Sequence, residues 1–350
     1  MTDPIRVGII GCGRVAADAH VPALASLDDA EVVAVADADP ARLAAVGDQA
    51  SVQRRYSDYR QLLDDRDVQV AVIGVPPVLH AEVARAGIAA GKHLLIEKPL
   101  AVTLEEADAL IALADGSGLR ITLGFNLRWH RLMRAAREMI ADGTVERPRL
   151  VTTAFTSAMG RRDDMPEWRK RRSTGGGVLF EIGVHHFDAW RFLLSTEVEE
   201  VFAGTQDDES EDDQAVVTAR LADGTLATAV FSQTTSTDNC LDLFANNGRL
   251  RLSLYRFDGL EWIPSGAIPG SISRRVQSGL STLRQLPAGV AAMRGGGDFQ
   301  AAYRAEWRHF LDCVRSGDEP ACSLRDGRQA LAVVVAPAES AESGLPVQVR

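Results

Sequence analysis

The chain has 350 residues, 46% of them apolar and 25% charged, which is enough for two domains with the composition of an ordinary globular protein. Its net charge of −10 argues against nucleic acid as the main partner. No segment approaches the roughly 18 uninterrupted apolar residues of a membrane span, so we expect no membrane partner.

The N-terminal residues and the cysteines bear on the cellular compartment. The first residues, MTDPIRVGIIGCG, lack the basic region of a secretion signal and enter a strand-like run almost at once. Cys12, Cys240, Cys313 and Cys322 include no C-x-x-C pair and show no spacing typical of metal ligands. We therefore expect a cytoplasmic protein with reduced thiols and no structural metal.

Residues 5 to about 124 alternate short apolar runs with helix-like stretches. The runs IRVGIIG, EVVAVAD, VQVAVIGVP, HLLIEKP and RITLGFN are nearly continuously apolar, as parallel strands covered on both faces are. The helix-like stretches between them span 14–27, 40–47, 57–64, 78–90 and 103–116. This βαβ alternation predicts an α/β domain over residues 1–124, with a doubly wound parallel sheet of the Rossmann type.

The first strand leads into GIIGCGRVA, which places Gly11, Gly13 and Ala16 in a G-x-G-x-x-A pattern at a helix start. Gly11 permits a tight turn, Gly13 lets backbone approach a pyrophosphate, and Ala16 allows close helix–strand packing. The phosphates would lie on free N–H groups of this helix start, where Arg14 and Val15 stand. The pattern predicts a dinucleotide site, the alternative being only a tight βα turn.

Asp37 ends the second strand at the distance expected of a ribose-binding acid. Its carboxylate would accept hydrogen bonds from a ribose diol and repel a 2′-phosphate. We therefore expect NAD to be preferred over NADP, although Arg42 nearby could soften this preference.

After a linking helix at 130–142 the pattern changes to alternating strands, which are RLVTTAFTS, EEVFAGT, QAVVTARLA, LATAVFSQTT, CLDLFANN and RLRLSLY. ADGT and NNGR between them are typical hairpin turns. The alternation predicts a C-terminal α+β domain over 125–350, with an open, mostly antiparallel sheet and a helix at 177–194 on one face. We expect this domain to bind substrate and to mediate oligomerisation.

Two segments are predicted as loops. The acidic stretch 205–214 is expected to be a solvated hairpin tip. The stretch 264–297, rich in Gly, Ser and Arg, is expected to be a loop or short helices leading into a helix at 299–315. Its arginines are Arg274, Arg275, Arg284 and Arg294. They could hold an anionic substrate or merely solubilise the segment, and a substrate lid or an oligomer contact is a further possibility. The last helix, 326–343, contains Pro337, which should kink or end it.

The stretch GGGVLFEIGVHHFDAW carries two of the seven histidines of the chain side by side. On a helix, Glu181, His185 and Asp188 share one stripe, whereas His186 falls among apolar positions. We therefore predict that His185 takes part in chemistry and that His186 packs. As metal ligands these adjacent side chains would diverge around the helix, so we expect no metal here.

Lys98, in AGKHLLIEKPLA, stands at the carboxyl end of a parallel strand, where open α/β sheets bind ligands. With GVPPVLHAEVARAGIAAGKH upstream and GGGVLFEIGVHHFD downstream, the chain resembles the Gfo/Idh/MocA oxidoreductases from RVGIIGCGRVA to ESAESGLPVQV. The resemblance implies a Rossmann domain and an open α/β substrate domain. It also implies hydride transfer between C4 of NAD(P) and a carbon of a sugar, cyclitol or related polyol.

The resemblance also assigns roles to residues. Lys98 matches the lysine beside the nicotinamide and the reacting hydroxyl, and Pro99 matches a proline whose preceding peptide bond is often cis. His185 matches the acid/base histidine and Asp188 the acid of its H-x-x-D. Glu181 occupies a place usually held by aspartate, from which pairing with His185 is expected.

The remaining assignments concern contacts to cofactor and substrate. Val75-Pro76 departs from a V-x-T-P pattern near the nicotinamide and so removes a hydroxyl, while His80 is expected to orient a loop. The expected cofactor-binding residues are Gly11, Gly13, Arg14, Val15, Asp37, Arg42, Val75, Pro76, His80, Glu97 and Lys98. The expected substrate-binding residues are Asn126, Arg128, Trp168, Arg169 and Asp188. For Trp168, packing as a cap over neighbouring residues is the alternative.

The expected catalytic residues are Lys98, His185 and Glu181. Oxidising a secondary alcohol needs a base for the hydroxyl proton, and histidine titrates near neutrality. Lys98 would stabilise the developing alkoxide. Two other functions stay open, namely glycoside cleavage with transient oxidation by NAD, and a non-catalytic dinucleotide-binding regulator that would be expected to lack Lys98 or His185. We expect a homodimer or homotetramer, because an open sheet needs its second face covered.

Overall fold

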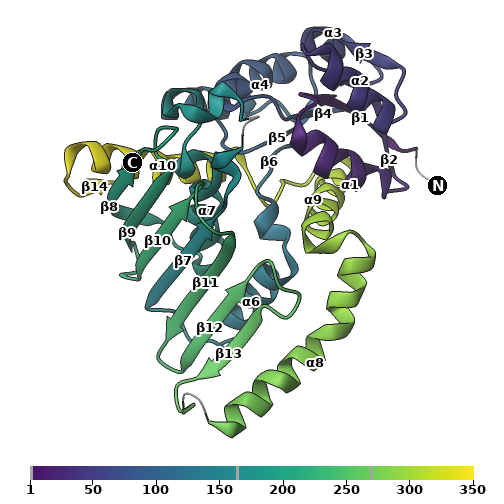
Figure 1. The fold of residues 1–350 in the computed structure, drawn as a ribbon. Coiled ribbons are helices and arrows are strands. Elements are labelled where there is room, and N and C mark those ends of the chain that lie inside the picture. The colour runs from purple at the N-terminus through teal and green to yellow at the C-terminus, as the bar shows by residue number, and fades with distance from the viewer. Residues whose placement is uncertain (1–2, 163–164, 269–270) are drawn as a thin grey trace. The chain divides into compact units, whose positions relative to one another are not determined.

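The computed structural model describes residues 3–162, 165–268 and 271–350, except for the side chains of 273, 274, 277, 278 and 281 (Figure 1). Arg274, one of the arginines noted above, thus has its side chain outside the described part. By their internal contacts the residues form two compact units. The first comprises Met1–Asn126, Ser173–Gly175 and Gln300–Leu331, and the second comprises Leu127–Arg172, Gly176–Phe299 and Ala332–Arg350. A single cut after residue 124 does not include the return of 300–331 to the first unit.

The first unit is built on a six-stranded sheet in the order β3-β2-β1-β4-β5-β6, and every pair of neighbours is parallel. The strands are β1 (Ile5–Ile10), β2 (Ala30–Ala36), β3 (Arg54–Tyr56), β4 (Val70–Ile73), β5 (His93–Ile96) and β6 (Ile121–Leu123). This is the order of doubly wound dinucleotide-binding domains, which confirms the predicted fold of this part. The sequence did not predict β3, because its three residues, RRY, form no apolar run.

The predicted helices of the first unit are present, with slightly different bounds. They are η1 (Ala16–His20), α1 (Val21–Ala25), α2 (Pro40–Gln49), α3 (Tyr59–Asp64), η2 (Pro77–Leu79), α4 (His80–Ala89) and α5 (Leu104–Ala114). The helix expected at 14–27 begins with η1, a π-helical turn. Helices α9 (Gly297–Ser316) and α10 (Leu324–Ser343) each have one part in either unit.

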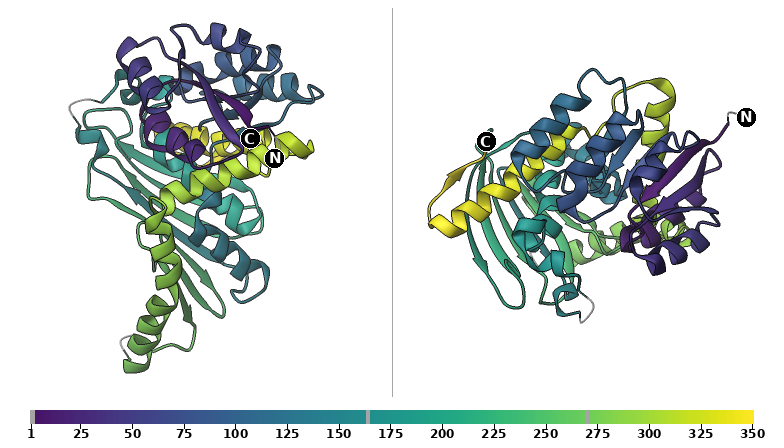
Figure 2. Two further views of the ribbon diagram at one scale, coloured as in Figure 1. Left: turned by 90° about the vertical axis from the view of Figure 1, so that its right-hand side faces the viewer. Right: turned by 90° about the horizontal axis from the view of Figure 1, so that it is seen from above.

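The core of the first unit explains why a C-terminal segment belongs to it. Ile5, Val7 and Ile9, on one face of β1, pack in one cluster with residues of α1 and with Trp307 and Phe310 of α9. Figure 2 shows the yellow-green α9 next to the purple N-terminal elements. Because successive side chains of a strand alternate between faces, the residues of β1 between these three point to the opposite face of the sheet. The apolar face of α9 therefore completes the Rossmann core.

The second unit contains an eight-stranded sheet in the order β13-β12-β11-β7-β10-β9-β8-β14. Its strands are β7 (Leu150–Thr156), β8 (Val198–Gln206), β9 (Gln214–Leu221), β10 (Leu226–Ser232), β11 (Asp238–Ala245), β12 (Gly248–Ser253), β13 (Leu260–Pro264) and β14 (Val347–Gln348). Only β7 and β10 run parallel to each other, so the predicted mostly antiparallel sheet is confirmed. The hairpins at ADGT and NNGR join β9 to β10 and β11 to β12.

Two long helices, α6 (Arg131–Ala141) and α7 (Val184–Leu194), pack against each other in this unit, and α6 contacts β12. The other helical segments are η3 (Asn126–Trp129), η4 (Met159–Arg161), η5 (Glu167–Lys170), η6 (Arg172–Thr174), η7 (Leu179–Gly183) and α8 (Ile272–Arg294). None of the helices within the described ranges is long and apolar enough to cross a membrane.

Two sequence-based expectations need correction. The stretch 264–297, expected as a loop or short helices, contains one helix of 23 residues, α8, because apolar residues recur in it at helical spacing. The last helix has the predicted extent, and of the two outcomes expected for Pro337, a kink or an end of the helix, the second does not occur, since α10 continues to Ser343. The acidic tip 205–214 is not solvated throughout, because Asp212 and Asp213 are buried.

Candidate active site

The turn after β1 has the geometry of a dinucleotide-binding loop. Gly11 has a φ of +93°, and a Cβ on it would lie 2.5 Å from the carbonyl oxygen of Gly74, so only glycine fits. A Cβ on Gly13 would meet no atom within 4 Å, so this backbone is open to the close approach of a ligand. Ala16 is buried in the core. The three positions of the motif thus fit a pyrophosphate at the start of η1.

Asp37 follows β2 and is fixed by backbone hydrogen bonds to both oxygens of its carboxylate. Cys12 donates its N–H to Oδ2 at 2.7 Å, and Asp39 donates its N–H to Oδ1 at 2.8 Å. The carboxylate is therefore held directly against the glycine loop. Arg42 points its guanidinium to Asp39, with Nε 3.3 Å from Oδ2, and Asp39 also caps α2 through the N–H groups of Ala41 and Arg42.

Arg14 and Val15 occupy the start of the following helix. The guanidinium of Arg14 lies 3.5 Å from the carboxylate of Asp18, and both side chains are exposed. Val15 is half-buried, and its Cγ1 would lie 3.2 Å from a Cβ on Gly74. The loop after β1 therefore packs against the end of β4.

His80 joins two of the predicted cofactor segments. Its Nε2 lies 2.8 Å from the carbonyl oxygen of Val75, next to Pro76, and its Nδ1 lies 2.6 Å from that of Pro99. Burial lowers the pKa of His80, with the two carbonyl contacts opposing this shift. The ring therefore ties the end of β4 to the E-K-P turn, which agrees with the expected orienting function. The peptide bond between Lys98 and Pro99 is cis, as the resemblance implied.

Glu97 lies in a buried network rather than at the surface. Its Oε1 is 3.1 Å from Nε2 of His20, and Nε1 of Trp307 donates to Nδ1 of the same histidine at 3.1 Å. A Cβ on Gly124 would come within 3.1 Å of the carboxylate, so this glycine leaves room for it. Burial raises the pKa of Glu97, but the hydrogen bond from His20 and the positive charge of Lys98 outweigh it, and the net shift is downward.

Sequence reasoning missed a second acid in this network, Glu306 of α9. It is 1% exposed, and neither carboxyl oxygen has a hydrogen-bond partner among the described residues. Burial and the negative charge of Glu97 raise the pKa of Glu306 well above its ordinary value. Tyr303, one turn earlier, is also buried. In the sequence, the feature that could have revealed Glu306 is its position between Tyr303 and Trp307, on the otherwise apolar face of α9.

Asn126, at the end of the first unit's main segment, is the predicted substrate residue that this unit contains. It is 7% exposed, and its Oδ1 has no hydrogen-bond partner among the described residues. Buried polar atoms are nearly always hydrogen-bonded, so such an atom marks a place where a ligand or water is accepted.

In the second unit, the glycine-rich turn leads into η7, a π-helical turn that carries Glu181. A Cβ on Gly176 would lie 2.3 Å from the carbonyl oxygen of Arg169, so the turn packs closely on the preceding segment. Arg169 also places Nε 3.4 Å from Oε1 of Glu181 and stacks its guanidinium 5.2 Å from the ring centre of Trp168. The structure thus brings Trp168, Arg169 and Glu181 together.

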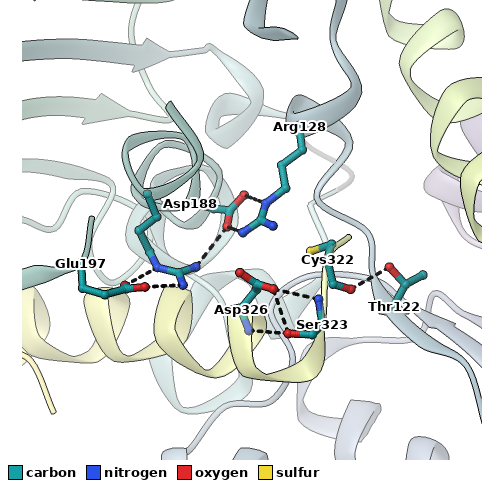
Figure 3. Close-up of polar contacts among 8 residues, drawn as sticks. Thr122, Arg128, Asp188, Glu197, Cys322, Ser323 and Asp326 are labelled. Carbon is teal, nitrogen blue, oxygen red and sulfur yellow. Dashed lines mark hydrogen bonds and ion pairs between the residues drawn. The ribbon is translucent and has the colours of Figure 1, made fainter. Parts of the chain in front are cut away.

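Two further predicted substrate residues pair with each other. Arg128 donates Nε to Oδ2 of Asp188 at 2.8 Å and Nη2 to Oδ1 at 2.6 Å, as Figure 3 shows. Arg191 approaches Oδ1 of Asp188 at 3.4 Å and donates Nη2 to Glu197 at 2.8 Å. Both Arg128 and Asp188 are buried. The carboxylate of Asp188 is therefore engaged by two arginines, and the π turn before α7 changes the register assumed for Glu181.

The two adjacent histidines differ as predicted. His186 is fully buried; its Nε2 lies 3.0 Å from Oδ1 of Asn239, and its Nδ1 contacts the hydroxyl of Thr153. Burial lowers the pKa of His186 to about 4, with the Asn239 hydrogen bond opposing this shift. His185 is half-buried in the first turn of α7. The packing of His186 is confirmed, and His185 is the more accessible ring.

Known protein families match this chain along most of its length. Residues 5–125 match the oxidoreductase family with an NAD-binding Rossmann fold. Residues 133–251 match the GFO/IDH/MocA C-terminal domain, and 280–349 match the C-terminal alpha/beta domain of the oxidoreductase family. The chain belongs to the Gfo/Idh/MocA oxidoreductases. This confirms the resemblance found in the sequence and makes the chain an enzyme of a family of dehydrogenases and reductases that act on alcohol groups.

Three relatives illustrate which proteins this Gfo/Idh/MocA chain is similar to. It is 28% identical over 347 residues to myo-inositol 2-dehydrogenase of Thermotoga maritima, covering 97% of this chain and 96% of that protein. It is 27% identical over 186 residues to scyllo-inositol 2-dehydrogenase (NADP(+)) IolW of Bacillus subtilis, covering 53% of this chain and 51% of that protein. The structure of levoglucosan dehydrogenase in complex with NADH and levoglucosan has a TM-score of 0.83 at 22% identity, covering 99% of this chain and 100% of that one. The fold class is therefore confirmed.

Proposed function

We propose that the chain is an NAD-dependent dehydrogenase or reductase of a sugar, cyclitol or related polyol. The observation that carries the proposal is that a Gfo/Idh/MocA chain retains both Lys98 of its E-K-P motif and His185 of its H-x-x-D motif. A bound nicotinamide would supply the hydride acceptor or donor. A non-catalytic regulator would have no need of these two side chains.

The first unit's residues fit a dinucleotide. Gly11 and Gly13 belong to a loop whose backbone N–H groups can bind a pyrophosphate, and the carboxylate of Asp37 lies against that loop. A negative charge at the ribose position repels a 2′-phosphate, so we propose that NAD is preferred over NADP. Arg42 is engaged with Asp39, which weakens its availability to a 2′-phosphate.

His185 is proposed as the acid/base. In the oxidation direction its ring nitrogen takes the proton of the substrate hydroxyl as the C–H bond gives up its hydride, and in the reduction direction it returns that proton. Lys98 is proposed to stabilise the negative charge that builds on the same oxygen. Glu181 is proposed to orient the ring of His185. Its carboxylate also pairs with Arg169, so we propose that it orients the side chain of Arg169 as well.

Substrate contacts are proposed for Asn126, Trp168 and Arg169. The buried Oδ1 of Asn126 supports a hydrogen bond from a substrate hydroxyl or a cofactor amide. An aromatic ring beside polar groups is a common platform for sugars, and the Trp168–Arg169 pair offers one. For Arg128 and Asp188, the mutual bidentate pairing favours a function in positioning α7, which carries His185.

The experiment is a screen of polyols, aldoses and nucleotide sugars by the change in NADH absorbance, with His185→Ala and Lys98→Ala as matched inactive variants. The proposal expects at least one substrate with turnover that both variants lose. Cleavage of a glycoside without net NADH formation would identify the transient-oxidation chemistry instead. Tight NAD binding with no turnover on any alcohol, and no effect of either variant, would contradict the proposal.

We also propose that the chain forms a homodimer or homotetramer.

A further inference from the structure

Helix α8 exposes its apolar side chains to solvent, whereas an ordinary surface helix buries them. Six apolar side chains on it are exposed by between 36% and 61%; they are Val276, Leu280, Leu283, Leu286, Val290 and Met293. Of these, Val276, Leu283 and Val290 recur every seven residues and so lie on one stripe of the helix. An amphipathic helix normally turns such a stripe toward its own core.

The side of α8 that faces its own unit is polar. Thr282 donates its hydroxyl to Asp258 at 3.0 Å, and Gln285 donates its amide to the carbonyl oxygen of Leu260 at 3.0 Å. A cavity of about 390 Å³ lies here, lined by Thr282 together with charged residues such as Arg251 and Asp258. Figure 1 shows α8 as one long helix beside the β12–β13 end of the sheet. The apolar stripe is therefore not part of this unit's core.

The charge of α8 is also unusual for this chain. The helix contains four arginines and no acid, whereas the whole chain has a net charge of −10. Within the described part of the chain, Arg275, Arg284 and Arg294 have no ion-pair partner. In the same unit, the β8–β9 tip exposes Asp207, Asp208, Glu209 and Glu211. Each copy thus carries a basic helix with unpaired charges and an acidic surface.

We propose that α8 is an interface helix that packs against a second copy of this chain, burying its apolar stripe and setting its arginines against the acidic surface of that copy. A helix of 23 residues is about 34 Å long and about 10 Å wide. In a two-fold arrangement each copy contributes one such face, about 340 Å², and a surface of about the same size that receives the partner's α8. Each partner then buries roughly 700 Å², of the order of the about 800 Å² per partner found in stable dimers. This proposal rests on the proposed homo-oligomer and not on the proposed hydride transfer.

A second copy is favoured over a lipid surface. A basic amphipathic helix also suits anionic lipids. However, the net charge of −10 opposes approach to an anionic bilayer and to a second copy alike, and only the second copy holds its acidic groups at fixed places that the arginines of α8 can match. A two-fold arrangement also satisfies both helices at once, because each copy is ligand and receptor.

The test compares Leu283→Glu and Val290→Glu with the matched control Ala288→Glu, which lies on the exposed flank outside the stripe. Sedimentation velocity on the full chain measures the dissociation constant of the assembly. We expect each stripe variant to raise it by about 100-fold or more, the effect of losing a buried apolar anchor. The control should change it by less than about 3-fold, and NAD binding by all three variants should verify the fold.

A second measurement locates the contact. A photo-crosslinking amino acid replaces Leu283, and ¹⁴N- and ¹⁵N-labelled chains are mixed before irradiation. Mixed-isotope crosslinks support the proposal. It is overturned by crosslinks within one chain only, by assembly that the stripe variants leave unchanged, or by a wild-type monomer. A monomer that binds vesicles of phosphatidylglycerol and phosphatidylcholine through the stripe would assign α8 to membranes. Turnover is measured separately, so failure here leaves the proposed reaction standing.

Discussion

His20 and Glu97 form a buried pair, with Nε2 of the histidine 3.1 Å from Oε1 of the carboxylate, and Glu306 is a second acid in the same core. Two neighbouring carboxylates do not both ionise in a buried site. His20 keeps the charge on Glu97, so Glu306 keeps its proton. The segment next to Lys98 therefore rests on a network with one negative carboxylate and one neutral acid.

Glu306→Gln tests this assignment, because glutamine is close in shape and stays neutral. The pKa of Glu306 is raised in the folded state above its ordinary value of 4.5, so wild-type stability is fully present below that value and falls as pH rises toward the folded pKa. We expect Glu306→Gln to gain stability relative to the wild type between pH 5 and pH 8 in urea unfolding. If Glu306→Gln instead lowers the free energy of unfolding by the same amount at pH 5 and at pH 8, Glu306 is ionised in the folded wild type at both pH values. As a control, Glu97→Gln should destabilise, since it removes the charged partner of His20.

Asp37→Asn tests the cofactor preference. The substitution keeps an oxygen acceptor for the N–H of Cys12 or Asp39 but removes the negative charge. We expect wild-type protein to bind NAD more tightly than NADP, and the variant to narrow the gap by about 10-fold or more, the value of one charge contact of about 1.4 kcal/mol. Titration of both cofactors measures it. Equal affinities in the wild type would remove the claim, and Arg42→Ala shows whether that arginine contributes.

The parts of this molecule that sequence could predict are those set by local chemistry. The glycine loop and Asp37 follow from a short motif at a strand end, and the six longer strands of the second unit follow from two-residue alternation. His186 was correctly separated from His185 by helical position alone.

The parts that sequence could not predict depend on tertiary contacts. The π turn η7 alters the register around Glu181, and no local propensity marks it. The pairing of Asp188 with Arg128, which lies 60 residues earlier in the chain, has no local signal in the sequence. For α8, the content of Gly, Ser and Arg led to the prediction of a loop or short helices, and the helical spacing of its apolar residues was missed.

The Arg128–Asp188 pair gives a prediction on stability. Removing one member of a buried ion pair leaves the other uncompensated, so Arg128→Met and Asp188→Leu should each cost about 3–5 kcal/mol of unfolding free energy. The double variant should cost less than the sum, which urea unfolding of all four proteins measures. If Arg128→Lys instead raises KM for the substrate without lowering Tm, the guanidinium contacts substrate, as the sequence first suggested.

The uncovered face of the second sheet gives a prediction on assembly. Val216 and Val230 stand opposite each other on neighbouring strands, and both are exposed. We expect this face to be an oligomer contact distinct from α8, because an exposed apolar sheet surface favours association. Val230→Lys should lower the mass measured by light scattering, whereas Ala222→Lys in the exposed β9–β10 turn should not. A wild-type protein that is monomeric at micromolar concentration would rule this contact out.

The two adjacent histidines should fail in different ways when replaced. His185→Ala and Lys98→Ala should leave Tm and NAD binding nearly unchanged and lower kcat by about 10²–10⁴, the usual value of a positioned acid/base. His186→Ala should lower Tm, because the ring fills a buried site and its loss leaves Asn239 without its partner. The surviving His186→Ala enzyme should keep most of its turnover.

The pH dependence of unfolding tests the burial of His186. His186 has a folded pKa of about 4 against 6.5 unfolded, so its neutral form favours folding above pH 6.5, and that stability is lost as pH falls toward 4. The loss amounts to about 3 kcal/mol. His186→Asn should show a shallower loss between pH 6.5 and pH 4 than the wild type. If His186→Ala abolishes turnover in a well-folded protein and His185→Ala does not, the two rings have been assigned the wrong way round.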